Sequence, residues 1–548
     1  MGDALRRGVA DAQSAIASVA FAEGGDVVPR RSRFDAFALL FGPCVGALLS
    51  LWLGLSTNWD LRNYHWYNAY ALLHGRHGFD VAVAHHATYY NPLLDLPLWA
   101  LAQVAPGWVC GAALGALQGL NFSLLYLLAR DGLQLPWRRG LAFALALVGV
   151  SGAFALSLLG TTSYDNVLSL ALLAGLWLLL RPGAGLGHAA AAAALAGISV
   201  GLKLPAAPFG LAMLAAIACR MPTPELRWRG VLIGGIAAAL GLLLTAGWWF
   251  WRLWQDTGNP IFPYFNQLIG SSLILDASYR DTRFLPQGVF EVLLFPLRFA
   301  LDWQVAADGP ISDWRIALAY VVALATLPLW LARRRSASAW FSAQALRVLM
   351  AFAATAYVSW LAVFGIYRYI TVLEMLAPLL TLALIGSWPL PAAARAWGGA
   401  GLLLAMLLLT RVDFSDRVPF TGDFIEVTPP AIPRPEASLA LMTGIEPMAY
   451  VIPSYPASIP FLRIDGWLVG PERDTPLLRR MRERIERHLD AGGDLYTLFA
   501  SYERERGDAA LARLGLQRSG RCQYVRGNLG PPLNWCPVQR RGRETSEP

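Results

Sequence analysis

Long apolar stretches alternate with short polar segments from residue 34 to residue 409. Most of these stretches approach the length of about 20 residues at which an α-helix crosses the hydrocarbon core of a bilayer. About 11 of them occur, and they predict a polytopic α-helical membrane protein. They cover residues 34–55, 109–129, 141–160, 167–180, 189–204, 206–219, 231–251, 316–331, 348–366, 370–387 and 396–409.

The composition supports a membrane protein, because 56% of the 548 residues are hydrophobic and only 15% are charged. Ordinary soluble enzymes carry about 25% charged residues. The formal net charge of +8 could indicate nucleic-acid binding. However, the basic residues cluster between apolar stretches, where cytoplasmic loops carry them. We therefore expect membrane lipids as partners and no nucleic acid.

Basic residues also predict the orientation of the chain. Arg30, Arg31 and Arg33 precede the first apolar stretch, so residues 1–33 are expected to form a cytoplasmic lead-in and the first polar loop to lie outside. An odd number of crossings then puts the C-terminal part outside as well. We predict a multi-pass protein of the cell inner (plasma) membrane whose C-terminal domain is periplasmic or extracellular.

The composition changes after residue 412. Residues 413–437 are rich in proline and predict a linker, and residues 438–548 alternate one amphipathic helix with short apolar runs, which predicts a small α/β domain. Within that domain Cys522 and Cys536 could form a disulfide on the oxidising side of the membrane. The other cysteines lie in apolar stretches and read as small hydrophobic residues.

The first outer loop, residues 56–95, crowds acidic, imidazole and aromatic side chains against the membrane surface. Such groups suit the polar head of a ligand with a lipid tail, so we interpret the loop as catalytic. Apolar residues 91–105 and 289–301 are too short to span and predict interfacial helices in the outer loops. The candidate residues of the first loop are Asp60, His65, His85, His86 and Tyr89.

An acid just past the first span, aromatic surface helices, a second acid in the outer sequence TTSYDN and an outer soluble tail form one arrangement. It resembles the GT-C superfamily of membrane glycosyltransferases, including protein O-mannosyltransferases and lipid A aminoarabinose transferases, over residues 34–412. The resemblance implies a sugar donor on a polyprenyl phosphate or diphosphate and a lipid, glycan or protein acceptor. It also implies that Asp60 is the general base and Asp165 a second catalytic acid.

The sequence departs from the oligosaccharyltransferases of that superfamily in two respects. TTSYDN carries one acid where those enzymes carry a pair, and the tail has no WWD-type motif. We therefore favour a polyprenyl-monophosphate donor and predict no metal site; a divalent cation lacks the support of paired acids. Direct displacement with one base would invert the anomeric carbon.

Three cations on the predicted outer side depart from the positive-inside pattern. Lys203, the only lysine, lies at the tip of a helical hairpin; Arg368 lies between two tyrosines, and Arg283 in a long loop. Ammonium and guanidinium groups bind phosphate, although lipid headgroups or surface carboxylates are alternative partners. One histidine of the pair at 85 and 86 could also donate to phosphate, but adjacent side chains point in different directions.

Each candidate acid has a structural alternative. Asp60 could cap a helix or pair with Arg62, and Asp165 could begin the next helix. If Asp60 is the base, its place beside a low-dielectric boundary predicts a raised pKa. The sequence is also compatible with three other functions: a transporter or flippase for a lipid-linked sugar, a transferase that uses a polyprenyl-diphosphate donor, and a non-catalytic assembly protein.

Overall fold

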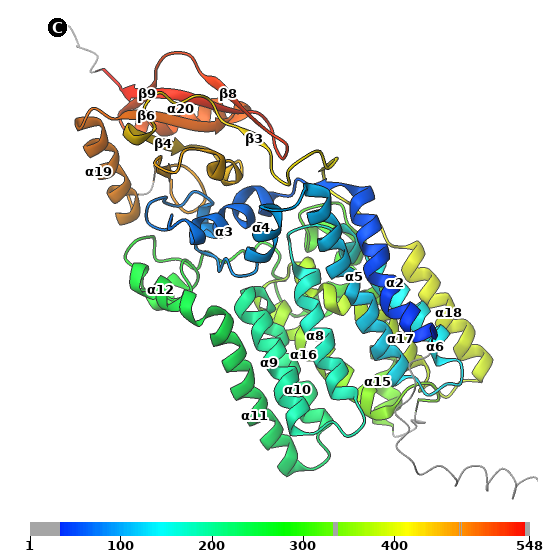
Figure 1. The fold of residues 1–548 in the computed structure, drawn as a ribbon. Helices are drawn as coiled ribbons and strands as arrows, with labels where there is room; N and C mark the ends of the chain where they lie inside the picture. Colours follow the sequence, from blue (N-terminus) through cyan, green and yellow to red (C-terminus); the bar gives the residue numbers. More distant parts are fainter. Residues whose placement is uncertain (1–32, 333–337, 471, 473, 543–548) are drawn as a thin grey trace, which may run out of the picture.

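The computed structural model describes residues 33–332, 338–470, 472 and 474–542. The predicted lead-in therefore lies outside the described residues, apart from Arg33. The described chain forms a bundle of helices with a β-sheet domain at one end (Figure 1). The first outer loop lies between the bundle and the sheet.

Every predicted apolar stretch contains a helix, and the described helices indicate a membrane protein. Residues 141–160 are divided at Ser151 and Gly152 into two helices, α6 (Arg138–Val150) and α7 (Ala153–Ser157). Five helices are long and apolar enough to cross a membrane: Arg33–Leu53 (α2), Gly107–Gly132 (α5), Pro224–Thr257 (α11, η4 and α12), Ala343–Val363 (α16) and Tyr367–Ile385 (η6 and α17). Shorter apolar helices are Asp165–Leu180 (α8), Leu186–Leu202 (α9), Leu204–Arg220 (η3 and α10), Arg315–Leu331 (α15) and Ala392–Leu408 (α18).

Helices α2 and α5 are packed backbone to backbone through glycines. Gly42 and Gly46 of α2 face Gly119 and Gly115 of α5, and a Cβ atom added to any of the four would overlap the backbone of the other helix. Small residues spaced four apart allow this close approach between membrane helices. The contact fixes the end of α2, from which the first outer loop begins.

The first outer loop is made of short elements rather than one surface helix. The predicted interfacial helix over residues 91–105 is shorter than expected, because Asn91 donates to the carbonyl oxygens of Gly201 and Thr245, both at 2.9 Å, and so ties the chain to the bundle. The predicted helix over residues 289–301 is present as α14 (Val289–Leu301). The segment between α2 and α5, which includes this loop, contains β1 (Leu55–Ser56), η1 (Leu61–His65), α3 (Trp66–Leu73), η2 (His85–Tyr89) and α4 (Leu96–Ala102).

The C-terminal domain is a seven-stranded mixed sheet with two helices, α19 (Pro476–Asp490) and α20 (Arg504–Arg513). Strand β4 is parallel to β5 and β6, whereas β9 is antiparallel to β6, β7 and β8. A disulfide joins Cys522 to Cys536. The strands are β3 (Val427–Thr428), β4 (Ser438–Met442), β5 (Phe461–Arg463), β6 (Asp494–Ala500), β7 (Leu516–Arg518), β8 (Gln523–Gly527) and β9 (Leu533–Arg540).

Residues 413–437, predicted as a linker, carry two short strands that pair with distant parts of the chain. Strand β2 (Arg417–Val418) pairs with β1, and β3 within the same segment pairs with β8, so the non-proline residues still make ladder hydrogen bonds. Arg463, which is 1% exposed, adds a contact between the domain and the first loop by donating to the carbonyl oxygen of Val83 at 2.8 Å. The sheet domain is therefore docked on the first outer loop.

Candidate functional site

Asp60 lies at the start of the first outer helix, where a π-helical turn follows it. The side chain of Asn58 accepts the backbone N–H of Leu61 at 2.8 Å and fixes this helix start. The π-turn η1 then runs from Leu61 to His65. Because a π-turn pairs residues five apart, it turns Asp60 and His65 toward the same face, and such turns are frequent at functional sites.

Arg368 is the partner of Asp60. It lies in η6 (Tyr367–Ile370), between α16 and α17, and its Nη1 donates to Oδ2 of Asp60 at 3.0 Å. Neither predicted alternative for Asp60 is seen, since its side chain caps no helix and Arg62 instead pairs with Glu446. A carboxylate and a guanidinium that are far apart in the sequence thus form one ion pair.

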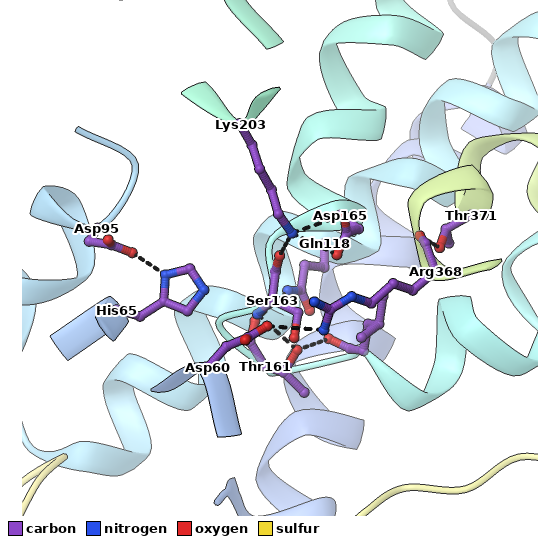
Figure 2. A network of polar contacts seen from close by, with 11 residues as sticks. Asp60, His65, Asp95, Gln118, Thr161, Ser163, Asp165, Lys203, Arg368 and Thr371 are labelled. Carbon is purple, nitrogen blue, oxygen red and sulfur yellow. Dashed lines mark hydrogen bonds and ion pairs between the residues drawn. The ribbon is translucent and has the colours of Figure 1, made fainter. Parts of the chain in front are cut away.

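A second ion pair lies beside the first, between Lys203 and Asp165 (Figure 2). The Nζ of Lys203, at the end of α9, donates to Oδ1 and Oδ2 of Asp165 at 3.0 and 2.9 Å and to the carbonyl oxygen of Ser163 at 2.6 Å. Asp165 is the first residue of α8, after Tyr164 in the left-handed region at φ 61°. Lys203 therefore binds the second outer loop rather than extending to lipid headgroups.

Two polar side chains of α5 hold the loop that presents Asp165. Gln118 donates to the carbonyl oxygen of Thr161 at 2.9 Å and accepts the N–H of Gly160 at 2.6 Å. Asn121 donates to the carbonyl oxygen of Asn166 at 2.7 Å. Both side chains are buried, and buried amides are tolerated where their hydrogen bonds are made. They fix the loop against the bundle.

His65 lies on the same face as Asp60 and pairs with Asp95. Its Nδ1 is 2.6 Å from Oδ1 of Asp95, and the two residues are 6% and 4% exposed. The ring meets the ring of Tyr164 edge-on at 4.9 Å. Figure 2 shows its second nitrogen directed toward the cluster around Ser163 and Asp60. The sequence gives no periodic signal for Asp95, which opens an apolar run, and its part in the site was missed.

The pKa of Asp60 is lowered, contrary to the expectation from sequence. Burial raises it, but attraction to Arg368, His65 and Lys203 together outweighs the burial. At Asp95 burial prevails over the attraction of His65 and Lys203, and the pKa is raised. Asp60 is therefore held as a carboxylate, because cations from other elements surround it.

His86 faces the site as a neutral imidazole. Burial lowers its pKa to about 4, although Asp60 and Asp281 oppose the shift. Its ring lies 6.0 Å from that of Trp467, which stacks on Trp59 at 4.9 Å. Trp467 belongs to the C-terminal domain, so this domain contributes a ring beside the site. Sequence reasoning did not identify it.

His85 lies outside the site. Its Nε2 faces the carbonyl oxygen of Ile445 and its Nδ1 accepts the backbone N–H of Trp467, both at 3.2 Å. The residue is fully buried, and both ring nitrogens are occupied. The interpretation of His85 as a phosphate ligand is therefore corrected: it anchors the C-terminal domain.

Tyr89 and Arg283 are also not brought to the site. The ring of Tyr89 packs edge-on against Phe262 at 4.7 Å. Arg283 has 67% of its side chain exposed and pairs with Asp281 at 2.7 Å and Asp308 at 3.2 Å. Tyr89 is thus held by aromatic packing and Arg283 by ion pairs at the surface, and neither position supports the predicted binding role.

An apolar groove of about 380 Å³ is formed by the helices that lead to the two cations. Helices α9, α10 and α11 and the end of α16 form it, with Val200, Leu211, Leu242 and Phe364 among the lining residues. Val200 lies three positions before Lys203, and Phe364 lies four before Arg368. The groove is thus lined by residues that precede both cations in the chain.

Within the described residues no three His, Cys, Asp or Glu side chains gather in a group that could hold a metal ion. No protein-family model matches the chain, and no curated protein matches it. The function is accordingly argued from the site itself: two buried ion pairs, a histidine–aspartate pair and an adjoining apolar groove.

Proposed function

We propose that the protein is a GT-C-like glycosyltransferase that moves a sugar from a polyprenyl-phosphate donor to an acceptor hydroxyl at the outer face of the inner membrane. The observation that carries the proposal is that Lys203 and Arg368 lie beside one ring, 5.7 and 5.4 Å from the centre of Tyr369, at the ends of helices that also form an apolar groove. A lipid-linked phosphate requires cations for its head and an apolar surface for its tail.

Arg368 is the better placed of the two cations to bind the phosphate. Its side chain is 32% exposed, against 13% for Lys203. A guanidinium has five N–H donors, and those not used by Asp60 and Tyr369 are available to phosphate oxygens. All three donors of Lys203 are directed at Asp165 and Ser163. Lys203 therefore contributes positive potential and holds the second loop.

Donor binding would activate Asp60. With the phosphate attached to Arg368, the carboxylate loses part of the attraction that lowers its pKa. Asp60 then accepts the proton of the acceptor hydroxyl as the acceptor oxygen bonds to the anomeric carbon. The bond from that carbon to the phosphate oxygen breaks, and its electron pair leaves with the polyprenyl phosphate. One displacement inverts the anomeric centre.

Two observations support an outer location for this site in a chain with the predicted number of about 11 crossings, which is itself part of the proposal. The site residues lie at helix ends that face the sheet domain, and that domain contains the Cys522–Cys536 disulfide. Disulfides persist on the oxidising side of a membrane. The predicted orientation, with the N-terminus in the cytoplasm, agrees with both.

The ionisable groups gather at helix ends, with Asp165 at the start of α8, Lys203 at the end of α9 and Arg368 in η6. This favours an enzyme over a transporter or flippase, which commonly binds its substrate near the bilayer midplane. Transfer would be measured in membranes supplied with a panel of radiolabelled polyprenyl-monophosphate and polyprenyl-diphosphate sugars. We expect transfer from a monophosphate donor and its loss in Arg368→Gln. Arg283→Gln, which changes an exposed arginine of another outer loop, is the matched control. Transfer from diphosphate donors alone, or sugar translocation without transfer, would contradict the proposal.

A further inference from the structure

A buried nitrogen without a hydrogen-bond partner lies in the candidate site. Nε2 of His65 has no hydrogen-bond partner among the described residues, and His65 is buried, with only 6% of its surface exposed. Leaving a buried polar atom unpaired is costly, so such atoms are rare in folded proteins. This nitrogen faces the cluster that contains Asp60 and Ser163 (Figure 2).

Asp95 determines which nitrogen of His65 carries the proton. The carboxylate lies 2.6 Å from Nδ1 and accepts a hydrogen bond from it. The neutral ring then has its proton on Nδ1 and a lone pair on Nε2. Asp95 itself is held at the start of α4, where its backbone N–H donates to the carbonyl oxygen of Pro92 at 3.0 Å. The pair is therefore oriented as a base aimed into the site.

Charged and titratable groups reach His65 from every element packed around it. Asp60 lies on the same helix and Asp95 at the start of α4; Tyr164 precedes α8. Lys203 and Arg368 interact with the acids beside it. Nε2 of His65 is thus the ring nitrogen that faces the two acids beside the cations, while Nδ1 is held by Asp95.

We propose that His65 takes over the proton that Asp60 removes from the acceptor hydroxyl, with Asp95 as its positioning residue. The inference rests on the proposed function. The proton leaves the Asp60 carboxyl oxygen and binds to Nε2 of His65, so Asp60 is again a carboxylate and can pair with Arg368 when the polyprenyl phosphate departs. The imidazolium then releases the proton to water. No other bond changes, and the site is returned to its starting charge.

The protonation state of His65 can be measured without any transfer assay. Nitrogen-15 NMR of histidine-labelled protein in detergent micelles would resolve the seven histidines of the chain. His65→Gln assigns the signal of interest. Two internal standards are available: His74, whose Nδ1 faces the carbonyl oxygen of Tyr70 at 3.0 Å, and His488, whose Nε2 faces that of Asp494 at 2.9 Å. Since a carbonyl only accepts, they define the Nδ1–H and Nε2–H forms.

We expect His65 to match His74, with the proton on Nδ1 at neutral pH, and Asp95→Ala to abolish this preference. A signal like that of His488, or a ring protonated on both nitrogens at neutral pH, would overturn the proposal. These results do not depend on transfer, so they separate a failure of this inference from a failure of the proposed function.

A kinetic measurement on an active preparation then tests the relay itself. Removing a general acid or base lowers rates by about 10²-fold or more, so His65→Gln should reduce kcat by that factor with KM nearly unchanged. Gln preserves size and hydrogen bonding, and full kcat in this variant would show that His65 has only a structural part.

Discussion

Replacing Lys203 by methionine should destabilise the protein by leaving Asp165 as a buried carboxylate without its cation. Methionine keeps a long apolar side chain, so the change removes mainly the ammonium and its three hydrogen bonds. The two side chains are only 13% and 7% exposed, and solvent cannot replace the lost partner. Removing one partner of a buried ion pair costs about 3–5 kcal/mol.

The double variant Lys203→Met with Asp165→Asn is the matched control. It removes both charges, so most of the cost of the single change should be recovered and the two effects should not add. The free energy of unfolding would be measured in mixed detergent micelles by tryptophan fluorescence, for which the chain offers 21 tryptophans. A loss below about 1 kcal/mol in Lys203→Met, the level of an exposed pair, would refute the reasoning. So would a double variant as unstable as the sum of the single ones.

Three further changes test other parts of the account. Arg368→Gln removes the main cation that lowers the pKa of Asp60, so this pKa should rise in a carbon-13 NMR titration of aspartate-labelled protein; an unchanged pKa would show that Arg368 does not hold Asp60 as a carboxylate. Cys522→Ser should lower the free energy of unfolding by roughly 3 kcal/mol, because the disulfide closes a loop of about 15 residues. Unfolding of the variant and of the wild-type protein is compared without reductant, and equal stability of the two would contradict this prediction. Arg463→Met leaves three backbone carbonyls without their donor and should speed proteolysis of residues 413–437, whereas an unchanged cleavage rate would show that the domain is held elsewhere.

The proximity of three candidate residues could be predicted from the apolar stretches. Lys203, Arg368 and Asp165 all lie at the ends of such stretches, and the predicted orientation puts these ends on one side of the bundle. Residues from distant parts of the chain can then meet, as the two ion pairs show. What the sequence could not supply is which cation pairs with which acid, because that depends on distances between loops.

The remaining members of the site depend on packing that has no sequence period. Asp95 meets His65 only because the first loop folds back at Asn91. His85 and His86 are neighbours in the chain, yet one is enclosed by backbone groups and the other faces Asp60. The lowered pKa of Asp60 has the same origin, since burial alone predicts the opposite direction.

The helical part of the fold could be predicted from the length of the apolar stretches. The structure confirms a mostly helical chain with a C-terminal sheet, including the helix Val289–Leu301, and five of its helices are long and apolar enough to cross a membrane. The proline-rich residues 413–437 show the limit of composition. Their strands pair with partners on both sides of the segment, and the partners lie far away in sequence.

Sugar transfer by Asp60→Asn is the most direct test of the central claim. Asparagine keeps the shape of the side chain but cannot accept the proton of the acceptor, so transfer from polyprenyl-phosphate sugars should fall by about 10²–10⁴-fold at unchanged expression. Asp308→Asn, on an exposed acid of another outer loop, should transfer at the wild-type rate. Equal transfer by Asp60→Asn and the wild-type protein would contradict the account and exclude Asp60 as the base.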